Sequence, residues 1–178
     1  AGKDFSGQDL SGTDLSKANL SMADLSSANL SGADLSNANL SGANLNDANL
    51  TGARLRHAEL NGATLERVDA SSAEFTGAQI QSASVADANF SKTDFTGTLF
   101  HEVGFENADF SAANLSRTQF PDEDLSNVEF TDATLIEATL NGANLSGATL
   151  QGANLRKANV DRVAASEADF TKARIQSV

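Results

Sequence analysis

The side chains of this chain that could carry out acid–base or metal chemistry are two histidines and an excess of carboxylates, because cysteine is absent. His57 and His101 are 44 residues apart, and neither has a second histidine near it. A pair of carboxylates acts as general acid and base only in a pocket that excludes water and shifts their pKa values. The residue types therefore predict no catalytic residue, no cofactor or metal site, and no enzyme activity.

The carboxylates are concentrated in the middle of the chain. The 178 residues include 24 acidic and 12 basic side chains, which gives a net charge of −12. Residues 69–137, which we call the acidic belt, contain thirteen acids and two bases, whereas residues 1–68 have a net charge of −3 and residues 138–178 of +2. This charge disfavours direct binding to nucleic acid or to an anionic membrane and favours a protein partner with a basic surface. The alternative is that the acids only keep the molecule soluble.

A strict five-residue repeat must position these carboxylates. Ser31–Leu50 has the sequence SGADLSNANLSGANLNDANL, which is four successive five-residue words. The large apolar residue of each word, position i, falls on every residue number divisible by five from Phe5 to Ile175. These 35 positions hold nineteen Leu and all ten Phe, while position i−2 is Ala in 24 words and twelve of the thirteen Gly lie at i+2. Large and small apolar residues therefore occupy two fixed places in every word.

Each word predicts a very short strand followed by a turn. A period of five fits neither an α-helix nor simple alternation. Positions i−2 and i lie on one side of an extended backbone and i−1 on the other, and the Ser, Thr, Asn and Gly at i+1 and i+2 are turn residues. Four such corners close a square, so residues twenty apart stack in columns. The Leu and Phe columns then fill the interior, and the i−1 residues face outward.

These words resemble those of the pentapeptide-repeat family, as in Ala33–Leu35 and Ala143–Leu145, and the resemblance covers essentially the whole chain. It implies an all-β fold, a right-handed quadrilateral parallel β-helix with four pentapeptides per coil. The 35 words then make just under nine coils in a single domain of residues 1–178. Some members of the family mimic the shape and charge of duplex DNA, bind gyrase-type topoisomerases and protect them from inhibitors.

The twenty-residue coil groups the acids of the belt into columns. Asp69, Asp109 and Glu129 share one i−1 column, and Glu74 and Asp94 share the next. The candidate partner-binding residues are Asp69, Glu74, Asp94, Asp109, Asp122, Glu123, Asp124 and Glu129.

One word within the belt is irregular, because Pro121 removes a main-chain donor and Glu123 falls on an inward i−2 position. An unpaired carboxylate there would cost several kcal/mol. We therefore expect a bulge or loop that brings Glu123 out to solvent, where it forms an acidic protrusion with Asp122 and Asp124. An accidental turn is the alternative.

The two ends of the chain depart from the consensus word. Residues 1–15 have polar i−2 side chains and are predicted to be a capping coil. The chain stops at Val178 with no capping helix, so an open apolar end that includes Ile175 and Val178 is predicted. Such an end indicates either end-to-end association into a homodimer or a fragment of a longer chain. Basic side chains gather there: Arg156, Lys157, Arg162, Lys172 and Arg174.

Three functions fit these observations. The first is a non-catalytic scaffold or protein-interaction module built on a rigid acidic rod. The second, implied by the resemblance, is a DNA mimic that binds a type II topoisomerase such as DNA gyrase. The third is a spacer within a larger secreted, lumenal or effector protein. No apolar run approaches the roughly 20 residues that span a bilayer, and no apolar leader precedes the repeats, so a soluble protein is expected, with the cytoplasm favoured over other compartments.

Overall fold

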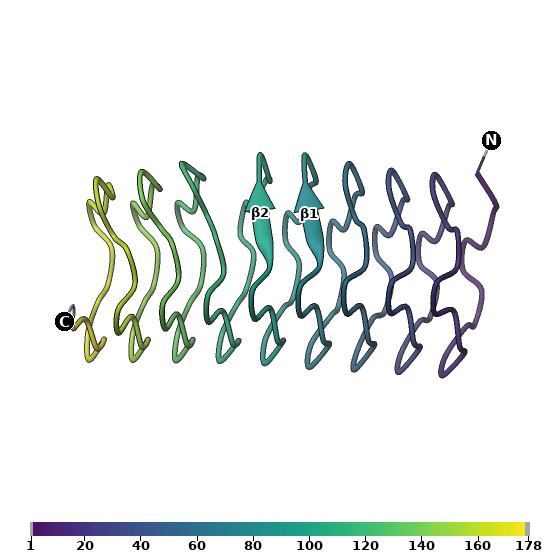
Figure 1. Cartoon of the computed structure of the whole chain (residues 1–178), viewed down its shortest axis with the longest axis horizontal. Coiled ribbons are helices and arrows are strands. Elements are labelled where there is room, and N and C mark those ends of the chain that lie inside the picture. The colour runs from purple at the N-terminus through teal and green to yellow at the C-terminus, as the bar shows by residue number, and fades with distance from the viewer. Residues whose placement is uncertain (1, 177–178) are drawn as a thin grey trace.

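The chain winds as a coil along one long axis, with its two ends at opposite ends of the rod (Figure 1). The computed structural model describes residues 2–176. Parallel bridges join residues that are twenty apart, from Asp4↔Asp24 at one end to Asn154↔Arg174 at the other. Four five-residue words therefore make one turn of the coil. The part of the chain that the structure describes contains no helix, and hence none that could span a membrane.

Two neighbouring coils each contain one three-residue strand. β1 (Gln79–Gln81) and β2 (Leu99–His101) pair in parallel, with Ile80 opposite Phe100. Both strands lie on the side of the rod that faces the viewer in Figure 1. The other words pair through single bridges, because each turns a corner after about three extended residues.

Each word is held by main-chain bonds within the turn and between coils. The N–H of Ala23 donates to the carbonyl of Leu20 across the turn at 3.0 Å, and the N–H of Leu20 donates to Asn39 in the next coil at 2.8 Å. The i+2 residue of each turn has a positive φ, as at Gly97 (70°) and Lys92 (59°). Glycine takes this conformation without strain, which explains its confinement to i+2. Twenty-three non-glycine residues take it as well.

The i−1 side chain closes the turn from outside. The Oδ1 atom of Asn39 accepts a hydrogen bond from the N–H of Ser41 at 2.9 Å, and Asp34 accepts one from Ser36 at 2.9 Å. Asn and Asp are favoured for this bond because each offers an acceptor oxygen two residues before the donor. The Asp and Asn side chains at i−1 therefore stabilise the turns, whatever else the charge of Asp contributes.

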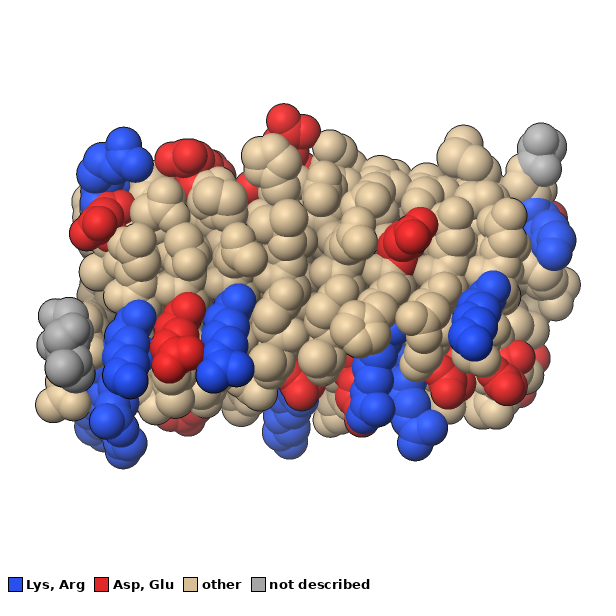
Figure 2. All heavy atoms as spheres, in the orientation of Figure 1, with Lys and Arg blue, Asp and Glu red and all other residues tan. Residues whose placement is uncertain are grey.

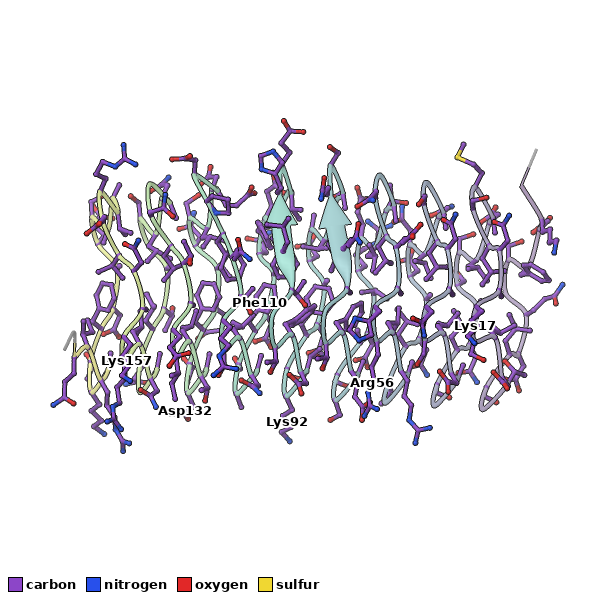
Figure 3. The ribbon with its side chains drawn as sticks, viewed as in Figure 1. Lys17, Arg56, Lys92, Phe110, Asp132 and Lys157 are labelled. Atoms are coloured by element: carbon purple, nitrogen blue, oxygen red, sulfur yellow. The ribbon has the colours of Figure 1, made fainter. Side chains whose placement is uncertain are left out.

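The core is one continuous stack of mostly apolar side chains. Residues at i and i−2 are buried from Leu20 to Leu155, and Val68 and Ala70, which exchange the large and small places, are buried too. The Phe side chains stack in the predicted columns, with ring centroids 5.2 Å apart for Phe90 and Phe110 and 5.5 Å apart for Phe110 and Phe130. Figure 3 shows Phe110 inside the rod.

Polar residues replace Ala at a few inward positions. Three buried threonines at i−2 donate their hydroxyl hydrogens to main-chain carbonyls at 2.8 to 3.1 Å, which satisfies groups that would otherwise be costly inside the core. They are Thr93, Thr98 and Thr118.

The prediction that a bulge or loop carries Glu123 out to solvent is wrong. Glu123 keeps its inward position and is 6% exposed, while Leu125 in the same word is fully buried. No acidic protrusion forms there, since of the three neighbouring acids only Asp122 and Asp124 are exposed. The hydrogen bonds that replace solvent for Glu123 come from the preceding coil.

The last coil leaves apolar side chains uncovered. Ile175 is 53% exposed, Val160 is 40% exposed, and a mostly apolar hollow of about 190 Å³ lies among them, Phe170 and Val163. Val178, the other residue predicted for this end, lies outside the described residues.

Candidate functional site

The structure places Asp69, Asp109 and Glu129 in one outward column, with Asn89 between the first two. We call these four residues the acidic column. One carboxylate oxygen of each acid caps its own turn: Asp69 Oδ1 accepts from the N–H of the residue two places on at 3.0 Å, Asp109 Oδ1 at 2.8 Å and Glu129 Oε1 at 2.9 Å. The second oxygen of each accepts no hydrogen bond from residues 2–176. Each acid therefore stabilises a turn and still presents a negative charge outward.

Glu74 and Asp94 lie in the next column, as predicted, and their charge is partly compensated. Arg56 approaches Glu74 at 2.7 Å, and Arg54 is the bridge partner of Glu74 on the preceding coil. Asp94 caps the turn at Thr96. This column is thus a weaker negative surface than the acidic column.

Charges at the corners of the rod are paired along their own columns. Arg67 binds Asp47 at 2.8 Å and Arg117 binds Glu137 at 2.9 Å, each across one coil. The guanidinium of Arg67 lowers the pKa of Asp47, and that of Arg117 lowers the pKa of Glu137. Exposed pairs of this kind add little stability.

Most acids of the belt have no such partner. Within residues 2–176, only Glu74 and Glu137 among the thirteen have a Lys or Arg nitrogen within 4.0 Å, and Glu123 has the Nδ1 atom of His101 at 3.9 Å. The negative potential of the belt is therefore uncancelled over much of its surface.

The faces of the rod differ in charge. The face seen in Figure 2 is mostly neutral across its middle, and basic and acidic side chains alternate near its lower edge. Figure 3 places Lys17, Arg56, Lys92, Asp132 and Lys157 along that edge. β1 and β2 lie on this neutral face, and the acidic column is two words away along the coil, on the opposite side.

The hydrogen-bond ladder between coils breaks once, beside Glu123. One coil earlier, Val85 N–H donates to Gly104 at 2.8 Å and Asp87 N–H to Glu106 at 2.8 Å. The equivalent bonds from Phe105 and Asn107 are absent from the described structure, as is the bridge that would join residues 104 and 124. We call this break, between residues 102–107 and residues 121–126, the seam. The spacing between the coil of β2 and the next coil is visibly wider there (Figure 1).

Glu123 fills the inner side of the seam. Its Oε1 atom accepts from the N–H of Glu102 at 2.7 Å and its Oε2 atom from the N–H of Val103 at 3.0 Å. The N–H of Glu102 would otherwise bond a main-chain carbonyl, as Ser82 and Asp122 do at the same place in the neighbouring coils. The buried carboxylate therefore has hydrogen-bond donors without moving out to solvent, and main-chain bonds of the ladder are missing beside it.

A hollow of about 90 Å³ lies at the seam. Glu106 lies across its rim over Gly104, since a Cβ atom at residue 104 would be 3.1 Å from Glu106 Oε2. Sequence reasoning did not single out Glu106. The available signal was Gly104, the one glycine of the sequence that is not at i+2. The hollow is lined by Val103, Gly104, Phe105, Glu106, Asp124 and Ser126.

The structure thus divides the eight predicted site residues into three groups and one separate residue, Asp122. The acidic column and the Glu74 column are separate surfaces, while Asp124 and the buried Glu123 belong to the seam. Asp122 sits at a corner, beside Gly142 of the following coil. His57 and His101 belong to different corners, and residues 2–176 hold no group of three or more His, Cys, Asp or Glu that could bind a metal ion.

Comparisons with known proteins agree with this repeat. A profile of the family described as pentapeptide repeats matches eight copies within residues 1–117 and 124–178. A search of curated protein sequences gave no match. Among solved structures, HetL from the cyanobacterium Nostoc sp. strain PCC 7120, a pentapeptide repeat protein involved in heterocyst differentiation regulation, is 26% identical with a TM-score of 0.70, over 97% of this chain and 86% of HetL.

Two further structures extend the comparison. A pentapeptide repeat protein from the thylakoid lumen of Arabidopsis thaliana is 34% identical with a TM-score of 0.53, over 54% of this chain and 67% of its own. Trypsin-treated QnrB1, described as a plasmid-mediated fluoroquinolone resistance protein, is 18% identical with a TM-score of 0.58, over 99% of this chain and 92% of QnrB1, and shows a shared fold alone. Since the family profile covers nearly all of the sequence and the bridges recur every twenty residues, the chain belongs to the pentapeptide repeat family.

Proposed function

We propose that this protein is a non-catalytic scaffold or interaction module that presents its acidic belt to a protein partner with a basic surface. The observation that carries the proposal is the acidic column, where three carboxylates on one face each keep an oxygen free and have no cation within 4.0 Å among the described residues. A surface that needed charge only for solubility would not require its acids to be unpaired and aligned.

The shape of the rod supports this use. We infer a single domain of residues 1–178, a right-handed quadrilateral coil of just under nine turns. Such a coil has flat sides, and stacked strands repeat at ~4.8 Å. Charges on one side are then held at fixed spacings, so this molecule loses little conformational entropy when it binds a partner.

A pair of charge-reversal variants tests the proposal. Asp109→Lys with Glu129→Lys changes the acidic column, and Asp14→Lys with Asp34→Lys is a matched control, since each pair lies one coil apart at i−1 and each member caps its own turn. For a 20-residue lysine- and arginine-rich peptide, we expect the first variant to weaken binding about 10-fold or more and the control by less than about 3-fold. Equal losses would show that the acidic column serves only solvation.

A second candidate function is binding to a type II topoisomerase in place of DNA. It is favoured by the repetition of carboxylates along one face of a rod, as at Asp109 and Glu129 on adjacent coils. Supercoiling by purified gyrase, measured with and without micromolar protein and with and without a fluoroquinolone, tests it. Unchanged activity and unchanged drug sensitivity would exclude this function and leave the general module.

We propose, separately, that the exposed apolar surface around Ile175 pairs with the same surface of a second copy. The support is the apolar hollow of about 190 Å³ and the exposed side chain of Ile175. Light scattering after size-exclusion chromatography should give a dimer mass that falls to the monomer mass in Ile175→Glu. A monomer at all concentrations of the unmodified protein would refute the pairing.

A further inference from the structure

The seam combines a break in the ladder with a hollow and a local excess of carboxylates. Glu106 and Asp124 line the hollow, and Glu123 lies one hydrogen bond behind it, through the N–H of Val103. Building on the proposed function, we propose that the seam is the anchor point of the acidic belt, where it binds the guanidinium group of an arginine side chain from the basic partner.

The charge at the seam lacks a counter-ion. Among residues 2–176, no Lys or Arg nitrogen lies within 4.0 Å of the carboxylates of Glu106, Glu123 or Asp124, and His101 is 52% exposed at 3.9 Å from Glu123. A carboxylate that is 6% exposed interacts with a nearby cation through little solvent, so that interaction is stronger than on an open surface. The charge of Glu123 thus adds, from within the core, to the charges of Glu106 and Asp124 at the hollow.

The chemistry of the walls favours an organic cation with several donors. The carbonyls of Val103, Asp124 and Ser126, which would complete the ladder, accept no hydrogen bond from any described N–H group. A guanidinium group offers five N–H donors in one plane, whereas an ammonium group is a compact, strongly hydrated charge. A bare metal ion fits poorly, since the described residues gather no set of three acidic or histidine ligands.

The size of the hollow is consistent with this occupant. A volume of about 90 Å³ equals about three water molecules in the liquid, so a guanidinium of four heavy atoms fits with about one water beside it. That water can accept from the N–H of Phe105, which has no acceptor among the described residues.

The test compares arginine with lysine and the seam with a matched site. Two 12-residue peptides, one with six arginines and one with six lysines among Gly and Ser, are titrated into ¹⁵N-labelled protein. We expect the arginine peptide to shift the amide resonances of Phe105 and Asn107 and to bind about 5-fold more tightly than the lysine peptide.

Asp124→Asn and Asp69→Asn provide the matched pair of variants. Both aspartates are exposed at i−1, both cap a serine (Ser126 at 3.1 Å and Ser71 at 3.0 Å), and both accept from an asparagine one coil on. Asn keeps the capping oxygen, so both variants should fold. We expect Asp124→Asn to weaken the arginine peptide about 10-fold and Asp69→Asn by about 2-fold or less.

The outcomes separate the two proposals. Equal losses in the two variants, or equal affinity for both peptides with no shift at Phe105 and Asn107, would overturn the seam as anchor and leave the acidic module intact. If neither peptide binds the unmodified protein, both proposals fail.

Discussion

At the scale of single residues, the outward aspartates first stabilise turns and only then supply charge. Ser36 holds the pKa of Asp34 below its ordinary value of 3.8, through its hydroxyl first and its main-chain N–H second, and Ser16 acts in the same way on Asp14. A lowered pKa means that the folded protein binds protons less readily than the unfolded chain. This part of the stability is complete above pH 3.8 and is lost as the pH falls below that value.

A variant that keeps the caps but removes the charge should therefore resist acid better. We expect the melting temperature of the unmodified protein to fall between about pH 4 and pH 2. The change Asp→Asn at residues 4, 9, 14 and 34 should give a shallower fall, because the amide oxygen still caps the turn, as Asn39 does. Circular dichroism melts across this pH range measure both. Parallel curves for the two proteins would contradict the capping argument.

The parity of the word predicts which side chains face inward, and this is why the core was predictable residue by residue. The capping role of i−1 was not, because parity says only that Asp34 points outward. Its bond to Ser36 depends on the conformation of the turn, where the i+2 residue, Asn37, has a φ of 58°.

At the scale of the coil, each layer of core side chains is stabilised by its contacts with the layers of the two adjacent coils. Phe110 is fully buried, and its ring lies 5.2 Å from that of Phe90 and 5.5 Å from that of Phe130. Phe110→Ala should lower the free energy of unfolding by about 3–5 kcal/mol, measured by urea denaturation. Phe110→Leu is the matched control, since Leu is the usual residue at i, and should cost less than Ala. A loss below about 1 kcal/mol in Phe110→Ala would mean that this layer is not the packed core described.

The layer that contains the seam leads to a different prediction, because Glu123 takes the place of an apolar side chain there. Glu123→Ala installs the usual i−2 residue and releases the N–H of Glu102 for a ladder bond like that from Ser82 to His101. We expect a gain of about 1–4 kcal/mol in the free energy of unfolding, since replacing a buried ionic group by an apolar one is often stabilising. Chemical denaturation measures the gain.

Glu123→Gln is the control for this substitution. It keeps the shape of the side chain but places an amide NH₂ against one of the two N–H groups, which then lacks an acceptor. The free energy of unfolding should therefore fall by about 1–3 kcal/mol. If Glu123→Ala also lowered the free energy of unfolding, the carboxylate would stabilise the seam rather than prevent ladder bonds from forming there.

The sequence could not show how Glu123 is accommodated, because the solution is not local. The cost of burying a carboxylate correctly indicated that the word at Pro121 is unusual. The donors belong to Glu102 and Val103, a coil earlier, where Glu102 gives up the ladder bond that its equivalents make. Nothing in the words of that coil beyond the misplaced Gly104 indicates this.

At the scale of the whole molecule, each coil contacts only its neighbours, so stability is approximately a sum over coils and their interfaces. Local opening should then be easiest where a coil has a neighbour on one side only or where the ladder is interrupted. The first condition holds near both ends, where side chains at i such as Leu10 and Phe170 are only partly buried. The second holds at the seam.

Protection from amide hydrogen exchange should therefore decrease toward both ends of the rod and have one minimum between them, at the seam. The N–H of Val85, bonded to Gly104 at 2.8 Å, and that of Leu125, bonded to Asn144 at 2.8 Å, occupy the same corner as the N–H of Phe105 one coil away on either side. We expect Phe105 to exchange about 100-fold faster than these two matched amides, because it has no acceptor among the described residues. Two-dimensional NMR in D₂O resolves the three positions, and in Glu123→Ala the Phe105 amide should become as slow as the others. Equal protection in the unmodified protein would mean that the ladder is continuous in solution, and the seam would then be closed as a binding site.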